Sequence, residues 1–253
     1  MPQLSVTIIT KNEAHNLPDA LASVAWADEI LVVDSGSTDE TVAVARRFTD
    51  RVISLDWRGY GEQKNHAASL AAHDWVMSLD ADERVGEPLA AEIQRLLSGT
   101  PGARGYRIPR LSHYLGRWIR GTDWYPDYQL RLYDRRHARW VTRAVHESVE
   151  VDGPVRTLSA DLTHHPYRDI AHHLETIDRY TTLAAQQLDE DGRRAGLGQL
   201  LVHPALAFLR NYILRRGIVI GRAGLIVSIL NSYYVFLKFA KLWERQHAPR
   251  RHA

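Results

Sequence analysis

The stretch DWVMSLDADERV, residues 74–85, joins a short apolar run to three acidic side chains, Asp80, Asp82 and Glu83. The continuous apolar run is typical of a strand that is buried on both faces of a sheet. The acids have two interpretations. They form a solvated turn before a helix, whose first turn favours negative charge, or they bind a divalent cation through their carboxylate oxygens.

Similar apolar runs alternate with helical patterns through the first hundred residues. We expect buried strands at 4–9, 29–34, 51–56 and 74–80, with helices between them, one of them at 37–48 behind a Ser/Thr cap. Strands that alternate with helices of about 10–15 residues indicate βαβ units and a parallel sheet. The sequence therefore predicts an α/β fold.

Polar residues gather where these four strands end. The strands are followed by TKNE (10–13), DSGS (34–37), Asp56 and DAD (80–82). Because ligands of parallel sheets bind beyond the carboxyl ends of the strands, acids at every such end favour a binding site over a set of solvated turns.

The pattern changes after the turn-rich segment GTPGARG, residues 99–105. A strand is expected at 103–111, and residues 113–141 are crowded with Trp, Tyr and Arg, which suit a sugar ring or fill an irregular core. From Tyr167 onward the chain has a helical pattern. We therefore expect a catalytic domain over 1–165, with halves at 1–99 and 100–165, and a helical extension over 166–253.

The composition limits the possible chemistry. The 253 residues are 45% hydrophobic and contain no cysteine, which excludes disulfides, thiolate metal sites and a cysteine nucleophile. The N-terminus, MPQLSVTIITKNE, lacks a basic segment followed by an apolar one, so we expect no signal peptide and a cytoplasmic location.

Seven segments together resemble glycosyltransferase family 2, the inverting nucleotide-sugar enzymes with a GT-A fold, which is a Rossmann-like, mostly parallel sheet flanked by helices. Within it the chain is most similar to the lipopolysaccharide core β-1,4-glucosyltransferase group. The resemblance covers roughly residues 4–190, and the segments that carry it are TIITKNEAHNL (7–17), VVDSGSTDET (32–41), GYGEQKNHA (59–67), DWVMSLDADE (74–83), GRWIRGTDWYPDYQLRLY (116–133), VHESVEV (145–151) and HHPYRDIAHHLETIDRYTTLAA (164–185).

The resemblance implies a divalent cation, Mg²⁺ or Mn²⁺, which stabilises the diphosphate that leaves. Asp82 matches the metal-binding position of the family's DXD motif, and Asp80 is expected to support the metal's water shell or the ribose. On the residues alone, Asp82 also fits a helix-capping acid. His164 and His165 are further possible ligands, or they form a plain turn before Pro166.

The resemblance also implies a set of donor-binding residues. Thr10 and Glu13 match positions that surround the base, and Asp34 matches the acid that reads uracil or ribose, although it also fits an N-cap of the following helix. Lys64 with Asn65, and Gln129 with Arg131, match positions near the donor phosphates. The full expected donor set is Thr10, Glu13, Asp34, Lys64, Asn65, Asp80, Gln129 and Arg131.

An inverting transfer needs one general base for the acceptor hydroxyl. The family carries it in an acidic motif after the RLY-like strand, which here is RAVHESV, so Glu147 is the expected base, with Asp127 and Asp123 as alternatives. A structural ion pair of Glu147 with Arg143 or Arg131 is the competing interpretation.

The last part of the chain is basic and apolar. Residues 200–253 carry nine Lys or Arg and one acid, a net +8, so the first 199 residues carry −6. Within residues 200–253, the run 217–241 is the most apolar. It predicts a helix that lies in the plane of an anionic membrane surface. The alternatives are a helix packed in the core or in a dimer interface. Nucleic acid is disfavoured as a partner, because the basic residues stand among aliphatic ones.

We therefore expect a transferase that moves a hexose, in particular glucose, from a UDP-sugar to a lipid-linked saccharide such as lipopolysaccharide inner core, at the inner face of the cytoplasmic membrane. A polyprenyl-phosphate sugar transferase and a non-catalytic nucleotide-sugar-binding protein are the alternatives. A sugar-nucleotide pyrophosphorylase would need a glycine-rich loop after the first strand, and TIITKNEAH has no glycine.

Overall fold

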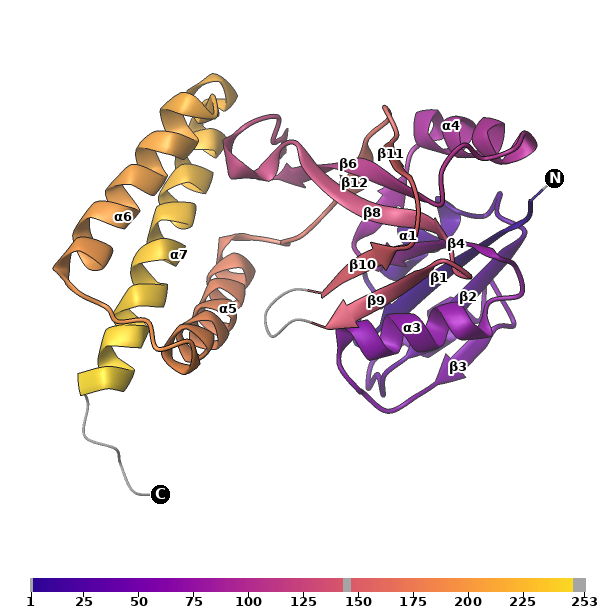
Figure 1. Cartoon of the computed structure of the whole chain (residues 1–253), viewed down its shortest axis with the longest axis horizontal. Coiled ribbons are helices and arrows are strands. Elements are labelled where there is room, and N and C mark those ends of the chain that lie inside the picture. Colours follow the sequence, from indigo (N-terminus) through magenta and orange to yellow (C-terminus); the bar gives the residue numbers. More distant parts are fainter. Residues whose placement is uncertain (1, 143–146, 248–253) are drawn as a thin grey trace. The chain divides into compact units, whose positions relative to one another are not determined.

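The computed structural model describes residues 2–142 and 147–247. They form two compact units, and each is described by itself (Figure 1). Unit 1 comprises Met1–Leu111 and Asp127–His164, and unit 2 comprises Ser112–Pro126 and His165–Ala253. The excursion 112–126 thus groups with the C-terminal helices, although most of the expected catalytic segment forms unit 1.

The first half of unit 1 is the expected parallel sheet. Its strands lie in the order β3-β2-β1-β4 and pair in parallel throughout. Short helices connect them, and α2 is shorter than the helix expected at 37–48. The elements are β1 (Leu4–Thr10), α1 (Leu17–Ala22), β2 (Glu29–Asp34), α2 (Thr41–Ala45), β3 (Val52–Ser54), α3 (Tyr60–Leu70) and β4 (Trp75–Asp80).

The second half of unit 1 continues the same sheet with antiparallel strands. β8 pairs with β4 on one side and with β6 on the other, and the sheet then runs through β12 to β5. The hairpin β9–β10 forms a separate two-stranded sheet. The elements are β5 (Glu83–Val85), α4 (Glu87–Ser98), β6 (Gly105–Tyr114), β8 (Asp127–Asp134), β9 (Ala138–Thr142), β10 (Glu147–Val151), β11 (Val155–Thr157) and β12 (Leu162–His164).

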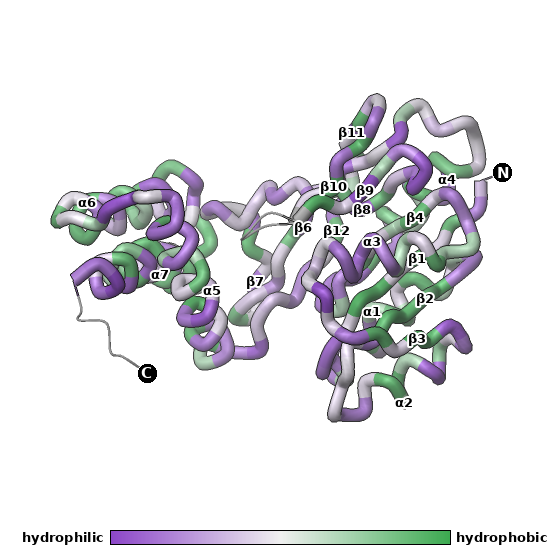
Figure 2. The backbone as a smooth tube through the Cα atoms, turned by 60° about the horizontal axis from the view of Figure 1, so that its bottom comes forward, coloured by the Kyte–Doolittle hydropathy of each residue, from purple (hydrophilic) through white to green (hydrophobic). Residues whose placement is uncertain are grey.

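The two faces of β4 have different neighbours, which fixes where its terminal acid points. Met77 and Leu79 belong to the main hydrophobic cluster, together with residues of α1 and α4. Val76 faces the other side and packs with Ala68 of α3. Because side chains alternate along a strand, Asp80 at the end of β4 lies on the α3 side. The trace of β1 and β2 is coloured mainly as apolar in Figure 2.

Unit 2 is built around two long helices, α5 (Ile170–Glu190) and α7 (Arg222–His247), with α6 (Leu197–Leu209) packed on α7. A π-helical turn, η2 (Arg210–Leu214), and a 3-10 turn, η3 (Gly217–Ile220), connect α6 to α7. The run expected as one helix at 217–241 is therefore broken at Gly221, whose φ is +72°. The remaining elements are β7 (Arg117–Trp118), which pairs with the end of β6, and η1 (Thr122–Trp124).

Among the described residues, only α7 is long and apolar enough to cross a membrane by length and composition, and 28% of its most apolar stretch is buried. The N-terminal end of α7 packs directly against η3. A Cβ at Gly224 would come within 1.9 Å of the Gly217 carbonyl oxygen, so only glycine permits this approach.

A buried asparagine joins three segments of unit 2. Asn211 is fully buried, and its Nδ2 donates to Asp123 Oδ2 and to the Ala207 carbonyl, both at 2.9 Å. Its Oδ1 accepts from the Asp123 N–H at 2.7 Å and from Asn231 Nδ2 at 2.9 Å. This one side chain thus links the loop before β8 to α6 and α7.

Replacing Asn211 by alanine should destabilise the protein by about 2–4 kcal/mol, because the buried partner groups lose their hydrogen bonds. Urea unfolding followed by circular dichroism measures this loss. Gln186→Ala is the matched control, since it removes one exposed hydrogen bond to Glu190 and should cost under about 0.5 kcal/mol. Equal unfolding midpoints for both variants would show that Asn211 does not hold these segments together.

Candidate functional site

The loops after β1 and β2 are bonded to each other at the carboxyl edge of the sheet. The Asn12 N–H donates to Ser37 Oγ at 2.8 Å, and Asn12 Oδ1 accepts from the Thr38 N–H at 2.8 Å. The Glu13 N–H donates to Thr41 Oγ1 at 2.8 Å. These reciprocal bonds hold two strand-end loops, TKNE and DSGS, in one fixed arrangement.

Two of the expected donor residues lie at the base of these loops. Asp34 is 2% exposed, and its Oδ2 accepts from the N–H groups of Gly36 and Ser37 at 3.0 and 2.9 Å. The N–H of Thr41, where α2 begins, goes instead to Asp39 Oδ1 at 3.0 Å. Asp34 therefore shapes its own turn and does not cap the helix. Thr10 is also buried, and its hydroxyl has no hydrogen-bond partner among the described residues.

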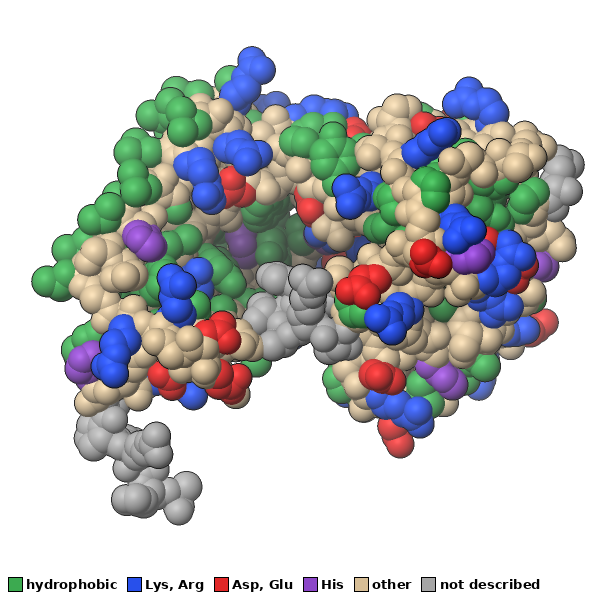
Figure 3. Space-filling view, viewed as in Figure 1, with side chains coloured by type: hydrophobic (Ala, Val, Ile, Leu, Met, Phe, Trp, Pro, Cys, Tyr) green, Lys and Arg blue, Asp and Glu red, His purple; other side chains and the backbone are tan. Residues whose placement is uncertain are grey.

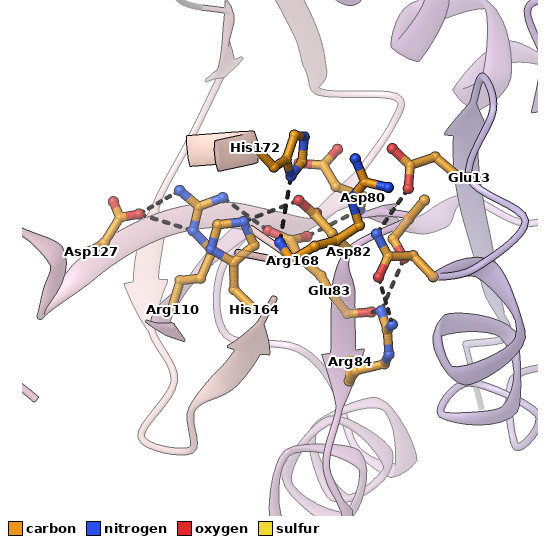
Figure 4. A network of polar contacts seen from close by, with 12 residues as sticks. Glu13, Asp80, Asp82, Glu83, Arg84, Arg110, Asp127, His164, Arg168 and His172 are labelled. Atoms are coloured by element: carbon orange, nitrogen blue, oxygen red, sulfur yellow. Dashed lines mark hydrogen bonds and ion pairs between the residues drawn. The ribbon is translucent and has the colours of Figure 1, made fainter. Parts of the chain in front are cut away.

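Glu13 lies at the mouth of the first loop. Its Oε2 accepts from Asn16 Nδ2 at 2.9 Å, and Asn16 Oδ1 accepts in turn from Arg84 at 3.4 Å. Figure 4 shows Glu13 and Arg84 beside the acids at the end of β4 and after it. The residue expected near the base is thus held at the same edge as the residues expected near the metal.

Asp80 is held between two cations. Lys64 Nζ lies 2.9 Å from Asp80 Oδ1, and an Arg131 Nη2 bonds Asp80 Oδ2. Lys64 is only 2% exposed and also stands 4.5 Å from the centre of the Trp140 ring. The lysine expected near the donor phosphates is therefore buried against Asp80 and an aromatic face, where cation–π attraction adds to the ion pair.

The chain of ion pairs continues through Glu83 into the antiparallel half. Glu83 is fully buried, and its Oε1 accepts from Arg131 at 2.7 Å and from Arg110 at 3.2 Å. Arg110 then bonds Asp127 Oδ2 through Nε and Nη2, at 2.9 and 2.6 Å. Part of this chain is drawn in Figure 4. The whole set, called the charge chain below, contains three cations and three carboxylates in alternation: Lys64, Asp80, Arg131, Glu83, Arg110 and Asp127.

The charge chain keeps its members ionised. Burial raises the pKa of Asp80, but the charges of Arg131 and Lys64 outweigh it, so the pKa of Asp80 lies well below its ordinary 3.8. Burial likewise works against the charge of Arg131, and the two carboxylates beside it raise its pKa above the ordinary 12.5. Both groups are therefore charged at every physiological pH.

Asp82 stands outside this chain. Its Oδ2 lies 3.3 Å from His164 Nε2, and its side chain is 30% exposed. Burial opposes ionisation of Asp82, but the hydrogen bond and charge of His164 outweigh it and lower the pKa of Asp82 below 3.8. Figure 4 shows both residues together, Asp82 from the turn between β4 and β5 and His164 from the end of β12.

An ionised carboxylate and an imidazole at this distance fit a divalent cation, since carboxylates suit Mg²⁺ and Mn²⁺ and imidazole binds divalent transition metals. Asp80 fits it less well, because each of its oxygens already faces a cation. Across residues 2–142 and 147–247, no three His, Asp or Glu side chains come together to hold a metal unaided. A cation at Asp82 would thus take further ligands from water and from a bound diphosphate, as Mg²⁺ commonly does.

The hairpin that carries Glu147 is fixed to α3 by Asn65. Asn65 Nδ2 donates to the Trp140 carbonyl and its Oδ1 accepts from the Trp140 N–H, both at 2.8 Å. Glu147 begins β10 opposite Thr142, while its side chain and residues 143–146 lie outside what the structure describes. Asn65 thus positions the strand pair on which the expected base stands.

The alternative bases are both engaged. Asp127 binds Arg110, and its Oδ1 accepts from Gln129 Nε2 at 2.7 Å. In unit 2, Asp123 binds Asn211 and Arg210. Sequence reasoning missed Arg110, which precedes Asp127 by 17 positions and meets it through the β6–β8 register, where the two residues are paired.

Comparisons with known proteins identify the family. The family model described as glycosyl transferase family 2 matches residues 5–145. The lipopolysaccharide core biosynthesis glycosyltransferase LpsC of Rhizobium meliloti is 31% identical over 96% of this chain and 92% of its own length. An uncharacterized glycosyltransferase of Rickettsia typhi is 31% identical over 96% of this chain and 88% of its own.

A solved structure supports the fold. Glucosyl-3-phosphoglycerate synthase from Mycobacterium tuberculosis, in complex with phosphoglyceric acid, superposes with a TM-score of 0.50 at 18% identity, over 79% of this chain and 83% of that one. The mixed, mostly parallel sheet with its helices is the GT-A architecture expected from the sequence. The family match spans the strand ends, Asp34 and the DAD turn, and the full-length relatives span both units. The chain belongs to glycosyltransferase family 2.

Proposed function

We propose that this glycosyltransferase uses a divalent cation to transfer a hexose, in particular glucose, from a UDP-sugar to a lipid-linked saccharide such as lipopolysaccharide inner core, with inversion at the anomeric carbon. The observation that carries the donor half of the proposal is the pair Asp82 and His164, 3.3 Å apart and outside the neutral charge chain. The similarity to a lipopolysaccharide core enzyme supports the acceptor half.

In this proposal Asp82 and His164 hold the cation, with Asp80 behind them. When bound, the cation neutralises the negative charge that develops on the departing diphosphate. Asp80 acts as a positioning residue, because Lys64 and Arg131 hold both of its oxygens. Gln129 acts in the same way on Asp127.

The nucleoside is assigned to the loops that follow β1 and β2. Thr10 and Glu13 would contact the base from one loop, and Asp34 would do so from the other. The support is that these loops are held together by hydrogen bonds within the protein itself. Such preorganisation lowers the entropy that binding costs.

Glu147 is proposed as the general base that takes the acceptor hydroxyl's proton as that oxygen attacks. Asp127 and Asp123 suit this role less, because Arg110 binds one and Arg210 the other. A carboxylate oxygen that already accepts a charge-assisted hydrogen bond from arginine is not placed to accept a substrate hydroxyl.

Two other functions remain distinguishable by product analysis. A polyprenyl-phosphate sugar transferase would glucosylate a lipid phosphate, and a non-catalytic binding protein would bind the donor without product. UDP-sugars should be tested one at a time against extracted lipopolysaccharide core and against a polyprenyl phosphate, with products identified by mass. A hexose added to the core saccharide from UDP-glucose is the expected result.

Asp82→Asn should weaken Mn²⁺-dependent UDP binding by about 10²-fold, because the variant lacks the anionic metal ligand, and should abolish transfer. His164→Ala should cause a smaller loss in the same calorimetric titration. Asp74→Asn, at the other end of β4, removes a surface carboxylate that pairs with Arg136 and is the matched control. Full wild-type activity in excess chelator would contradict the role of the metal.

Glu147→Gln keeps the shape of the side chain and removes its basicity, so the turnover rate should fall by roughly 10²–10⁴-fold while UDP affinity stays near the wild-type value. Glu150→Gln is the control on the same strand, where Glu150 pairs with Arg139 at 3.3 Å. Single-turnover kinetics separates chemistry from binding. If Asp127→Asn loses the chemical step and Glu147→Gln retains it, Asp127 is the base.

A further inference from the structure

One surface of unit 2 exposes large apolar side chains along consecutive elements. Six of them are more than 55% exposed, and they lie on α6, η2 and η3. Figure 3 shows apolar side chains along the outer edge of this unit. The set, called the α6–η3 surface, is Leu197 (76%), Leu201 (66%), Leu206 (57%), Leu214 (77%), Ile218 (56%) and Val219 (73%). A contiguous apolar surface of this kind marks a binding site for a protein or a membrane.

A basic pocket of about 310 Å³ opens at the end of this surface. It is lined by Arg117, Trp118, Arg120, Arg216, Val219 and Ile220. Val219 belongs both to the pocket and to the α6–η3 surface, so the two are continuous. Arg117 and Arg216 form no ion pair with any carboxylate in the described part of the chain. Their guanidinium groups are thus available to an anion, and phosphate oxygens are the acceptors that arginine matches in geometry.

The convergence of these arginines is built into the backbone. The Thr122 N–H donates to the Arg215 carbonyl oxygen at 2.7 Å, which docks the segment after β7 on the turn between η2 and η3. A Cβ on Gly121 would come within 2.8 Å of that same oxygen. The close approach requires glycine, and it brings Arg117 and Arg120 beside Arg216.

The charges around the surface have one sign. Residues 197–222 contain Arg210, Arg215, Arg216 and Arg222 and no Asp or Glu. Of these, Arg210 and Arg215 face Asp123. An apolar band bordered by arginine and tryptophan is the composition of a helix that lies in a membrane interface.

We propose that the α6–η3 surface lies in the headgroup region of an anionic bilayer and that the pocket of Arg117, Arg120 and Arg216 takes a lipid phosphate. This deepens the membrane-linked acceptor in the proposed function, and it moves the membrane contact from the expected run 217–241 to residues 197–220, which share only η3 with that run. Along α7, Asn231 binds Trp124 and Lys241 binds Asp178, so those polar groups are used within the unit.

The dimensions favour a helix in the plane of the membrane. α6 has 13 residues, about 20 Å at 1.5 Å per residue, which is less than the roughly 30 Å of a hydrocarbon core. A second copy of the chain is disfavoured as the occupant. A two-fold dimer places the same patch against itself, which would bring Arg216 and Arg222 toward their own copies, and residues 197–222 contain no acid to compensate them.

The test is sedimentation of the full chain with vesicles, in the absence of donor. The protein should bind phosphatidylglycerol–phosphatidylcholine vesicles at low salt, bind pure phosphatidylcholine weakly, and be released by high salt. Each arginine near an anionic surface is worth about fivefold in partition, so R117Q/R216Q should lower binding by about 25-fold. R193Q/R194Q removes the same charge from exposed positions of the same unit and should change binding less than about threefold.

The apolar side chains of the surface are tested by a second variant with its own control. L201Q/L214Q should lower vesicle binding by at least about tenfold, whereas I170Q/L183Q, which alters two exposed apolar side chains on α5, should change it little. All variants should keep the wild-type circular dichroism spectrum and UDP affinity, which checks that each has folded.

Three results would overturn the inference. The first is a wild type that fails to sediment with anionic vesicles. The second is an equal loss of vesicle binding in R117Q/R216Q and R193Q/R194Q, which would show that binding depends only on net charge. Alternatively, sedimentation velocity finds a stable dimer that L201Q/L214Q dissociates, so that a second copy covers the surface. A protein that binds vesicles as expected but transfers no sugar would leave this inference standing and contradict the proposed function.

Discussion

The ion pair between Asp80 and its two cations, Lys64 and Arg131, is the constraint on which the rest of unit 1 depends. Lys64 comes from α3 and Asp80 from the parallel half of the sheet, while Arg131 comes from the antiparallel half. Removing any one of them would leave an uncompensated charge in the interior, which typically costs 3–5 kcal/mol. The two halves are therefore joined at β4 and β8 by electrostatics as well as by strand pairing.

This pairing also separates the roles of the neighbouring acids. Because the charge chain is balanced within itself, it presents no free negative charge to a ligand. Asp82, two residues beyond Asp80, is the carboxylate left to face solvent with His164 beside it. On α3, Lys64 binds Asp80 at the end of β4. The next residue, Asn65, binds the hairpin that carries Glu147. One helical turn thus positions two parts of the candidate site.

The sequence predicted the fold because hydrophobic runs and strand-end acids are local signals. The parallel order of four strands and the edge that holds Asp34 and Asp82 follow from them. The roles of single residues depended on distant neighbours. β4 ends at Asp80, so Asp82 lies in a turn, where the two-residue alternation of strand side chains does not apply. Lys64 was expected near a phosphate because it matches a position of the family, and its partners in the structure, Asp80 and Trp140, are distant in the sequence. Arg110 could be found only from the β6–β8 register.

Unit 2 shows the opposite relation between charge and burial. Its interior polar groups are neutral amides such as Asn211 and Asn231, which satisfy one another, while Arg117 and Arg216 are turned outward with apolar side chains around them. Nothing within the fold requires this arrangement, since exposed leucines and valines gain no burial and neighbouring guanidinium groups repel. Gly121 and Gly224 nevertheless hold these segments at contacts that no other residue permits. Such a surface is unfavourable in water, and the proposed contact with an anionic bilayer would cover both its apolar side chains and its arginines.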